Sequence, residues 1–589
     1  MNLSFKKPKI PDNPSETIKD RLEEIEQATV SHAQKYLVRR WANFRDVGQK
    51  ALIWLIVVMA ISIGVIQQTK ALDGFYKVSI PAVGGVYSEG VVGRAENFNP
   101  MFASSEAEAT VSHLLFSGLL KYDASNNLTG DLASGWNADE TGKVYTVTLR
   151  ADARWQDGTP VRSDDVVYTV HTIQDPATRS PLESSWRGVS VQALDPTTVR
   201  FTLPSPFPPF PYSLTLGIIP QHILGDTPAY QLRTSSFNLQ PTVGDGPFSF
   251  QEARAFQNHE EVKLVRNPGF YGGQAKPDRF VVEAYQNYDD MVDAFRNHEI
   301  SAAGGLRPAE LTSLKAQGVQ RFNAPLQHAT FAFFKTSQIE LQDIHVRQAL
   351  TLATDKTTLL KKLDNWFTPI NLPLLKGQIG YNPALDVSSY NQVQAGALLD
   401  QAGWVKDASG VRHKDGKPLE LNLVASSSDE YPIVAAELQR QWQSLGITIH
   451  TSLIKPSDFQ QNVIIPHNYD ILLYELAIGQ DPDVFAYWHS SQAVEKGLNL
   501  SEYRSQRADE ALEGGRTRIN PTLRAAKYTA FLDQWVADDP AVALYQPGYG
   551  YAFRSSVSGF QAHTLVDPVD RFTNITDWTA ENRQAIATH

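Results

Sequence analysis

The carboxylates and histidines are the residues of this sequence that could do chemistry. His298 and Glu299 match the first half of an H-E-x-x-H zinc helix, but no second histidine follows at the required spacing. Asp481 and Asp483 flank a proline and could share a cation or move a proton. A calcium loop, however, needs more oxygen ligands and a glycine at a fixed place. We therefore expect no metal site and no cofactor.

The motifs of the common enzyme classes are missing from the sequence. There is no phosphate loop, no G-x-S-x-G nucleophile elbow and no dinucleotide-binding G-x-G-x-x-G after a strand. The chain has 0 cysteines, which excludes disulfides, thiolate metal sites and a cysteine nucleophile. Its net charge of −11 offers no basic surplus for phosphates. We expect no catalytic residues, no enzyme activity and no nucleic-acid partner.

One apolar segment predicts the topology. Residues 51–66 carry no charge, and residues 67–69 could extend them toward the thickness of a bilayer. The basic side chains gather on the N-terminal side, at Lys35, Arg39, Arg40, Arg45 and Lys50. This asymmetry favours a cytoplasmic N-terminus and an extracytoplasmic remainder. No clean cleavage site follows the segment, so we favour an uncleaved, single-pass signal anchor at 51–69 in the cell membrane over a cleaved signal peptide.

The rest of the chain has to position any ligand site. Residues 1–50 predict a cytoplasmic amphipathic segment, and the glycines and proline of 70–90 predict a linker. From about residue 90 the pattern is mixed α/β. Alternation or apolar runs predict strands at 145–149, 198–203, 280–285 and 419–424, and helical spacing predicts helices at 289–297, 346–353, 392–402 and 431–445.

Six sequence motifs follow one another in a recognisable order. The first runs from Leu132 to Thr169, LASGWNADETGKVYTVTLRADARWQDGTPVRSDDVVYT. The later ones are PTVGDGPF at 241–248, VRNPGFYGG at 265–273, VRQAL with ATDK at 346–356, NYD with DPDVF at 468–485, and DDPAVALYQP at 538–547. In this order they resemble the family 5 extracellular solute-binding proteins of bacterial ABC importers, the oligopeptide-, dipeptide- and nickel-binding type.

The resemblance implies an α/β fold, a periplasmic-binding-protein-like two-lobed clamp with an extra α/β domain, here preceded by one transmembrane helix. Mapped onto this chain, it divides the exterior part into three bodies. Lobe I comprises 91–117, 240–328 and 540–589, the extra domain comprises 118–239, and lobe III comprises 329–539. A ligand would be buried between lobes I and III by a hinge motion.

The resemblance also implies the ligand-binding segments. One contains Phe102, Ser104, Ser105 and Glu106, and the other contains Ile478, Gly479, Gln480, Asp481 and Asp483. Peptide-binding members carry an aspartate three residues before the DP pair, where it holds the ligand's α-ammonium, but this sequence has Ile478 there. Glu106, Glu475, Asp481 or Asp483 could substitute, or the ligand lacks a free amine.

We therefore expect the substrate-binding component of an ABC importer, a monomer that captures peptides and delivers them to the permease subunits. Two alternatives stay open. The same scaffold could bind a different small solute, or the chain could be a membrane-anchored sensor.

Overall fold

The computed structural model describes residues 39–388 and 390–586. The chain forms two compact units: Met1–Ile80 with Arg583–His589, and Pro81–Asn582. Residues 1–38 of the expected cytoplasmic segment lie outside the described residues. Its remaining residues, 39–50, belong to a long helix.

That long helix is α2 (Arg39–Tyr76). Its stretch Gly48–Gln68 has 21 residues and a mean hydropathy of 2.2, and its side chains lie exposed. At 1.5 Å per residue the stretch measures about 31 Å, which matches the hydrocarbon core of a bilayer. The described part of the chain thus has one helix that is long and apolar enough to be a transmembrane anchor or a signal sequence.

The linker expected at 70–90 is wrong for most of its length. Helix α2 continues to Tyr76, and two strands follow, β1 (Lys77–Ala82) and β2 (Val86–Val92). Strand β1 pairs with β24 (Glu581–Ile586) in a two-stranded sheet. The glycines suggested a linker, but Tyr87 and Val91 alternate on one face and are fully buried, as in a core strand.

Strand β2 lies inside a seven-stranded sheet, the centre of lobe I. It pairs in parallel with β11 and β12, and the other neighbours of the sheet are antiparallel. In spatial order the strands are β13 (Val319–Pro325), β23 (Gly548–Arg554), β12 (Ala302–Leu306), β2, β11 (Arg279–Tyr285), β10 (His259–Arg266) and β9 (Phe248–Ala255). The helices of this lobe are α3 (Glu106–Leu115), α8 (Tyr288–Arg296) and α9 (Pro308–Ser313).

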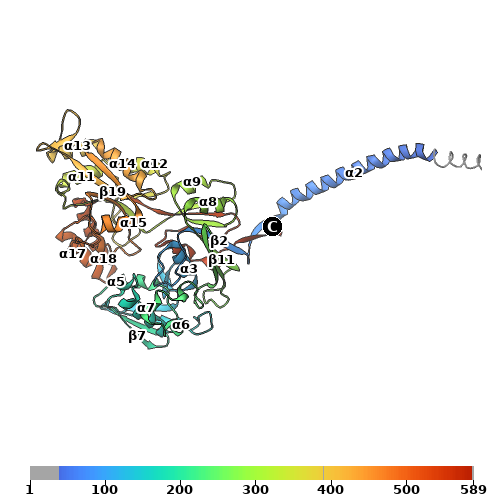
Figure 1. The fold of residues 1–589 in the computed structure, drawn as a ribbon, viewed down its shortest axis with the longest axis horizontal. Coiled ribbons are helices and arrows are strands. Elements are labelled where there is room, and N and C mark those ends of the chain that lie inside the picture. The colour runs from blue at the N-terminus through green and yellow to red at the C-terminus, as the bar shows by residue number, and fades with distance from the viewer. Residues whose placement is uncertain (1–38, 389, 587–589) are drawn as a thin grey trace, which may run out of the picture. The chain divides into compact units, whose positions relative to one another are not determined.

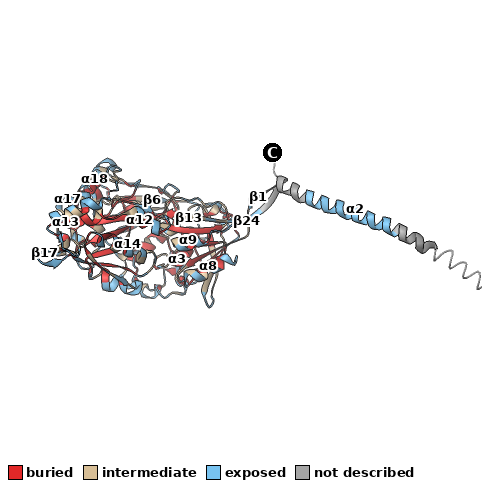
Figure 2. Ribbon diagram, turned by 90° about the horizontal axis from the view of Figure 1, so that it is seen from above, coloured by how far each residue is buried: buried red, intermediate tan, exposed pale blue. Residues whose placement is uncertain are grey.

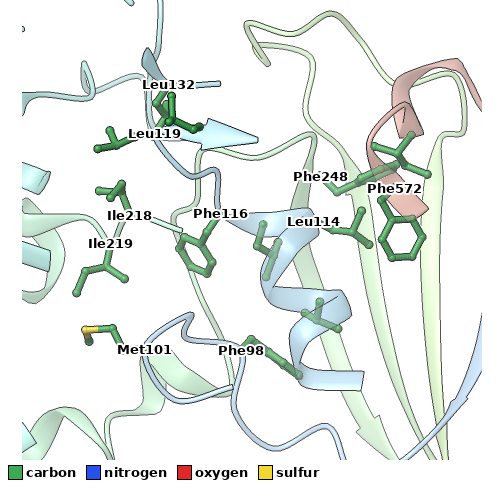
Figure 3. Packing of buried hydrophobic residues seen from close by; sticks show 14 of the residues in the cluster. Phe98, Met101, Leu114, Phe116, Leu119, Leu132, Ile218, Ile219, Phe248 and Phe572 are labelled. Carbon is green, nitrogen blue, oxygen red and sulfur yellow. The ribbon is translucent and has the colours of Figure 1, made fainter. Parts of the chain in front are cut away.

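The extra domain shares its core with lobe I. Its four-stranded sheet is ordered β5 (Ala133–Ala138), β6 (Val144–Leu149), β8 (Thr198–Thr202), β7 (Ser190–Asp195), next to the pair β3 (Leu120–Tyr122) and β4 (Leu128–Gly130). Its helices are α4 (Ser163–Gln174), α5 (Glu183–Trp186), α6 (Gln221–Leu224) and α7 (Ala229–Leu232). Figure 3 shows Leu114 and Phe116 between Phe248 and Phe572 on one side and Leu119 and Ile218 on the other, all in one apolar cluster.

Lobe III has a six-stranded sheet with cores of its own. Its order is β15 (Thr368–Pro369), β22 (Ala541–Gln546), β14 (His328–Phe334), β21 (Ile471–Ala477), β19 (Glu420–Ser426), β20 (Thr448–Ile454), and a small sheet of β16 (Val405–Lys406), β17 (Arg412–Lys414) and β18 (Lys417–Pro418) lies beside it. Two apolar clusters cover its two faces, one with Ala332 and Leu473 and the other with Phe331 and Leu472. The central strands of the two large sheets, such as β14 and β22 here and β12 in lobe I, are mostly buried, whereas the helices keep exposed faces (Figure 2).

The helices of lobe III gather around this sheet (Figure 1). They are α10 (Ile339–Gln342), α11 (Ile344–Leu352), α12 (Lys356–Lys362), α13 (Gln392–Gln401), α14 (Tyr431–Gln443), α15 (Pro456–Phe459), α16 (Phe485–Trp488), α17 (Gln506–Thr517) and α18 (Pro521–Asp538). The strands predicted at 145–149, 198–203, 280–285 and 419–424 and all four predicted helices are present within two residues.

Candidate ligand-binding site

Lobe I and lobe III are joined by two short crossings of the chain. Strand β13 leads into β14 through Leu326 and Gln327, and β22 leads into β23 through Pro547. The Leu326 N–H donates to the Pro547 carbonyl at 2.9 Å, and the Gln327 N–H donates to the Leu565 carbonyl at 2.7 Å. Two adjacent, hydrogen-bonded crossings thus connect the separately packed sheets, and these crossings, Leu326–Gln327 and Pro547, are called the hinge below.

The second predicted segment begins at this hinge. The N–H groups of Ile478 and Gly479 both donate to the Gln327 carbonyl at 3.0 Å, and the Gln327 side chain donates to Gln480 Oε1 at 3.0 Å. Gly479 has a φ of +77°, a left-handed conformation that favours glycine. Ile478 is buried in the apolar cluster of Phe331. Its side chain therefore belongs to the core of lobe III.

The two aspartates of this segment are held by arginines. Arg524 donates to both carboxylate oxygens of Asp481 in a bidentate pair, with N–O distances of 2.8 and 3.0 Å, and both side chains are almost fully buried. Asp483 lies 3.3 Å from the Arg516 guanidinium. Burial raises the pKa of Asp483, although Arg516 acts in the opposite direction. Both carboxylates fix the course of the chain after β21.

The first predicted segment caps helix α3. The Ser105 hydroxyl accepts the Glu108 N–H at 3.1 Å, and the Glu108 carboxylate accepts the N–H groups of Ser104 and Ser105 at 2.8 and 3.1 Å. This reciprocal arrangement is a capping box. The Phe102 ring is buried, with the Arg233 guanidinium 5.8 Å from its centroid. Phe102, Ser104 and Ser105 thus have structural partners.

Glu106 belongs to a buried polar network. Its carboxylate accepts the Tyr549 hydroxyl and lies 3.8 Å from Arg571. Arg571 in turn binds Glu89 at 2.6 Å, and both of those side chains are fully buried. Burial raises the pKa of Glu106, and Arg571 and the Tyr549 hydroxyl oppose this rise. Because Tyr549 follows the second crossing by two residues, this segment also meets the hinge.

A third carboxylate cluster lies beside the hinge on lobe III. Glu475 on β21 pairs with His328 on β14, with 2.6 Å between Oε1 and Nδ1. Glu430 precedes α14, and its Oε1 accepts the Tyr545 hydroxyl at 2.9 Å. Burial, with smaller contributions from Glu475 and Asp429, raises the pKa of Glu430 to about 7. The sequence signal for Glu475 is a lone acid in the apolar strand ILLYELA.

A cavity of about 370 Å³ opens between lobe I and the extra domain. Tyr122, Tyr212, Asp567 and Asp570 are among its lining residues. Burial raises the pKa of Asp570 to about 7 and also raises that of Asp567, which His328 opposes. The sequence analysis did not predict these four residues as lining a cavity. They come from segments far apart in the sequence, which only the fold brings together.

The structure does not join the two predicted segments to each other. They lie in separate lobes, and no hydrogen bond links them among the described residues. Within the same residues no cluster of three or more histidine, aspartate and glutamate side chains has the geometry of a metal site.

Known proteins resemble the chain over most of its length. AppA, an oligopeptide-binding protein of Bacillus subtilis, is 24% identical and covers 90% of this chain and 98% of its own. Protein XP55 of Streptomyces lividans is 28% identical over 74% of this chain and 78% of its own.

Solved structures show the same fold. NikZ from Campylobacter jejuni, in complex with Ni(L-His), has a TM-score of 0.69 and 26% identity and covers 84% of this chain and 99% of its own. CtaP from Listeria monocytogenes has a TM-score of 0.74 and 24% identity over 85% of this chain and 100% of its own.

The family description that matches residues 127–496 is "Bacterial extracellular solute-binding proteins, family 5 Middle". These residues include most of the extra domain, the 240–328 part of lobe I with the first crossing, and most of lobe III. The family consists of transport binding proteins, so the chain is a binding protein and not an enzyme. The ordered motifs, the two-lobed α/β fold and this match agree, and the chain belongs to the family 5 bacterial extracellular solute-binding proteins.

Proposed function

We propose that the chain captures peptides between lobe I and lobe III and delivers them to the permease of an ABC importer. The observation that carries the proposal is the hinge, at which two separately packed bodies are joined by two adjacent crossings. Lobe I and the extra domain share one core and would move together. The division of the chain into three bodies is part of the proposal.

Peptides are the favoured solute because of the relatives. AppA of Bacillus subtilis is named as an oligopeptide-binding protein. Its crystal structure with a nonapeptide has a TM-score of 0.68 to this chain, at 24% identity. An extended peptide pairs with backbone groups in such a cleft, which gives affinity with little side-chain selectivity.

We further propose that α2 remains uncleaved and anchors a monomer in the cell membrane, with the N-terminus in the cytoplasm. The length and apolar character of Gly48–Gln68 support the anchor, and the preceding basic residues support its orientation. Tethering would hold the binding unit near the permease. The sensor alternative depends on a cytoplasmic segment whose first 38 residues lie outside the described part.

The test is the native ligand. The full chain is solubilised from membranes in mild detergent and purified without denaturation, and the compounds that co-purify are identified by mass spectrometry. A mixture of peptides supports the proposal. A single non-peptide compound contradicts it, and a parallel purification from membranes that lack the protein controls for contaminants of the detergent.

A non-peptide solute is the second candidate, and one observation favours it. At the position where an aspartate was expected to hold the ligand's amine, Ile478 packs into the core of lobe III. A ligand without a free amine would need no acid there. NikZ, whose structure holds Ni(L-His), shows that this fold accommodates a ligand that is not a peptide.

A further inference from the structure

A further cavity, of about 440 Å³, lies within lobe III. The described residues that line it come from α11, α13, the end of α18, the start of β22 and the segments between these elements. Ala541, in the cavity wall, precedes the Pro547 crossing by about 20 Å of extended strand at 3.3 Å per residue. The cavity is therefore separate from the proposed peptide cleft.

The walls of this cavity are mostly apolar. Leu352, Leu398 and Trp535 line it from α11, α13 and α18. Val387 and Val536 lie at its mouth, since they line the cavity and keep 62% and 39% of their surface exposed. The volume falls within the range of about 300–1,000 Å³ that small-molecule sites have. The cavity can thus admit a small molecule with an apolar part from solvent.

Two side chains of opposite charge line the same cavity. Lys356, at the start of α12, donates from Nζ to the Ile370 carbonyl at 2.7 Å and to Asn371 Oδ1 at 2.6 Å. One N–H of its ammonium remains. Asp539, after α18, is only 7% exposed, and its Oδ1 accepts the Thr351 hydroxyl at 3.0 Å. Its Oδ2 accepts no hydrogen bond from the described residues.

Neither charge forms an ion pair among the described residues. Asp386, the other acid near Lys356, accepts the Asn371 amide at 2.7 Å. Arg347, the cation near Asp539, donates to backbone carbonyls at the end of α18. Burial lowers the pKa of Lys356 to about 8 and raises that of Asp539 to about 7. Since an unpaired charge in the interior is costly, a ligand that brings the opposite charge to each group would stabilise both.

We infer that this cavity is a binding site for a free apolar α-amino acid. The α-carboxylate of the amino acid accepts the remaining N–H of Lys356, and its α-ammonium donates to Oδ2 of Asp539. Its side chain packs against Leu352, Leu398 and Trp535. The inference goes beyond the proposed function, because it adds a second ligand at a second place in the chain.

A zwitterion fits the cavity better than a ligand with a single charge. A fatty acid would pair with Lys356 but bring a second negative charge beside Asp539. An alkylamine would pair with Asp539 but bring a second positive charge beside Lys356. Like charges in a partly desolvated site repel each other. An α-amino acid carries both charges on one carbon, and its side chain supplies the apolar part.

The experiment measures binding of L-leucine to the full chain in mild detergent by isothermal titration calorimetry. N-acetyl-L-leucine lacks the ammonium, L-leucinamide lacks the carboxylate and glycine lacks the apolar side chain. Lys356→Met and Asp539→Asn each remove one charge. The matched controls are two exposed residues of the same helices, Lys361→Met on α12 and Asp533→Asn on α18. Val387→Trp narrows the mouth and leaves both charges in place, so it tests the site even where a charge variant fails to fold.

The wild type and both controls should bind L-leucine about 10- to 100-fold more tightly than N-acetyl-L-leucine or L-leucinamide, as the loss of one charged hydrogen bond implies. Glycine should also bind more weakly than L-leucine. Lys356→Met and Asp539→Asn should lose a similar factor for L-leucine. Val387→Trp should weaken L-leucine binding and leave the binding of a mixture of short peptides unchanged.

A saturating mixture of short peptides should not displace L-leucine. The inference is overturned by the absence of measurable L-leucine binding, by equal binding of L-leucine and its two blocked forms, by unchanged binding in the cavity variants, or by displacement with peptides. Each of these results leaves the proposed function intact. A chain that binds L-leucine but no peptide would contradict the proposed function alone.

Discussion

Lobe I and lobe III each contain a buried arginine–carboxylate pair, and the two pairs differ in their surroundings. In lobe I, Arg571 and Glu89 are fully buried. The Tyr87 and Tyr551 hydroxyls also donate hydrogen bonds to the Glu89 carboxylate, at 2.8 and 2.5 Å. In lobe III, Arg524 and Asp481 keep 6% and 7% of their side-chain surface exposed. Each pair secures a segment near the hinge, the C-terminal one in lobe I and the one after β21 in lobe III.

The difference shows that the role of a carboxylate depends on its partner and on its burial. A carboxylate that is paired with arginine and surrounded by further hydrogen bonds holds distant segments together, because leaving either charge alone in the interior is costly. The Glu475 carboxylate differs from both, because its partner is a histidine and its side chain keeps 28% of its surface exposed.

The largest effect is expected from Arg571→Met. It leaves Glu89 buried without a counter-charge, which costs about 3–5 kcal/mol. Hydrogen exchange followed by mass spectrometry should show lost protection in β2 and in the C-terminal segment before lobe III is affected. Adding Glu89→Gln should recover part of the loss. Unchanged protection in β2 would show that the pair does not stabilise lobe I.

Arg524→Met should have a smaller effect, about 2–3 kcal/mol, because Asp481 can reach water when its partner is gone. Protection should fall in α18 and in the segment after β21, and β2 should keep its exchange rates. The comparison between the lobes fails if this variant loosens β2 as much as Arg571→Met does.

A buried acid that forms no ion pair with an arginine should make the stability of the protein depend on pH. Burial raises the pKa of Asp570 to about 7 in the folded protein. Between the unfolded value near 4 and about pH 7, the folded state retains a proton that the unfolded state releases, so stability falls as pH rises. Asp570→Asn cannot ionise and should remove part of this slope in urea unfolding, on the order of 1–3 kcal/mol between pH 4 and 8.

The matched control is Glu140→Gln, an exposed acid of the extra domain, which should leave the pH profile unchanged. If Asp570→Asn leaves the same slope as the wild type, Asp570 is ionised throughout and the assignment of its raised pKa is wrong.

The smallest effect concerns a contact between the extra domain and lobe III. The Arg516 guanidinium lies 5.1 Å from the Phe207 ring and 4.6 Å from the Phe485 ring. Phe207→Leu removes one partly buried cation–π contact, about 0.5–1 kcal/mol, and should raise the ligand's off-rate roughly two- to fivefold. An unchanged off-rate would mean that this contact does not contribute to the closed form.

Much of the fold could be predicted from the sequence, because local patterns determine it. The alternation in VYTVTL and the helical spacing in 431–445 each specify an element without help from elsewhere in the chain. Strand β2 was missed because Gly90 and the glycines before the strand suggested a linker, and only its neighbours β11 and β12 make it a central strand.

The site was harder to predict because it depends on partners far away in the chain. Asp481 was expected to contact ligand, but it is held by Arg524, 43 residues away. Glu106 was expected in the same role, and its partner Tyr549 is 443 residues away. No local pattern reveals such pairs, so the sequence could mark the two segments but not which acid remains free.

The hinge can be tested most directly by a distance between the lobes. Since the chain has no cysteine, Gln257→Cys on lobe I and Val393→Cys on α13 of lobe III, both exposed, allow specific spin labelling of the full protein. Double electron–electron resonance should show the interlobe distance distribution shift and narrow when a mixture of short peptides is added. A distribution that stays the same while peptide is bound would contradict capture by hinge closure.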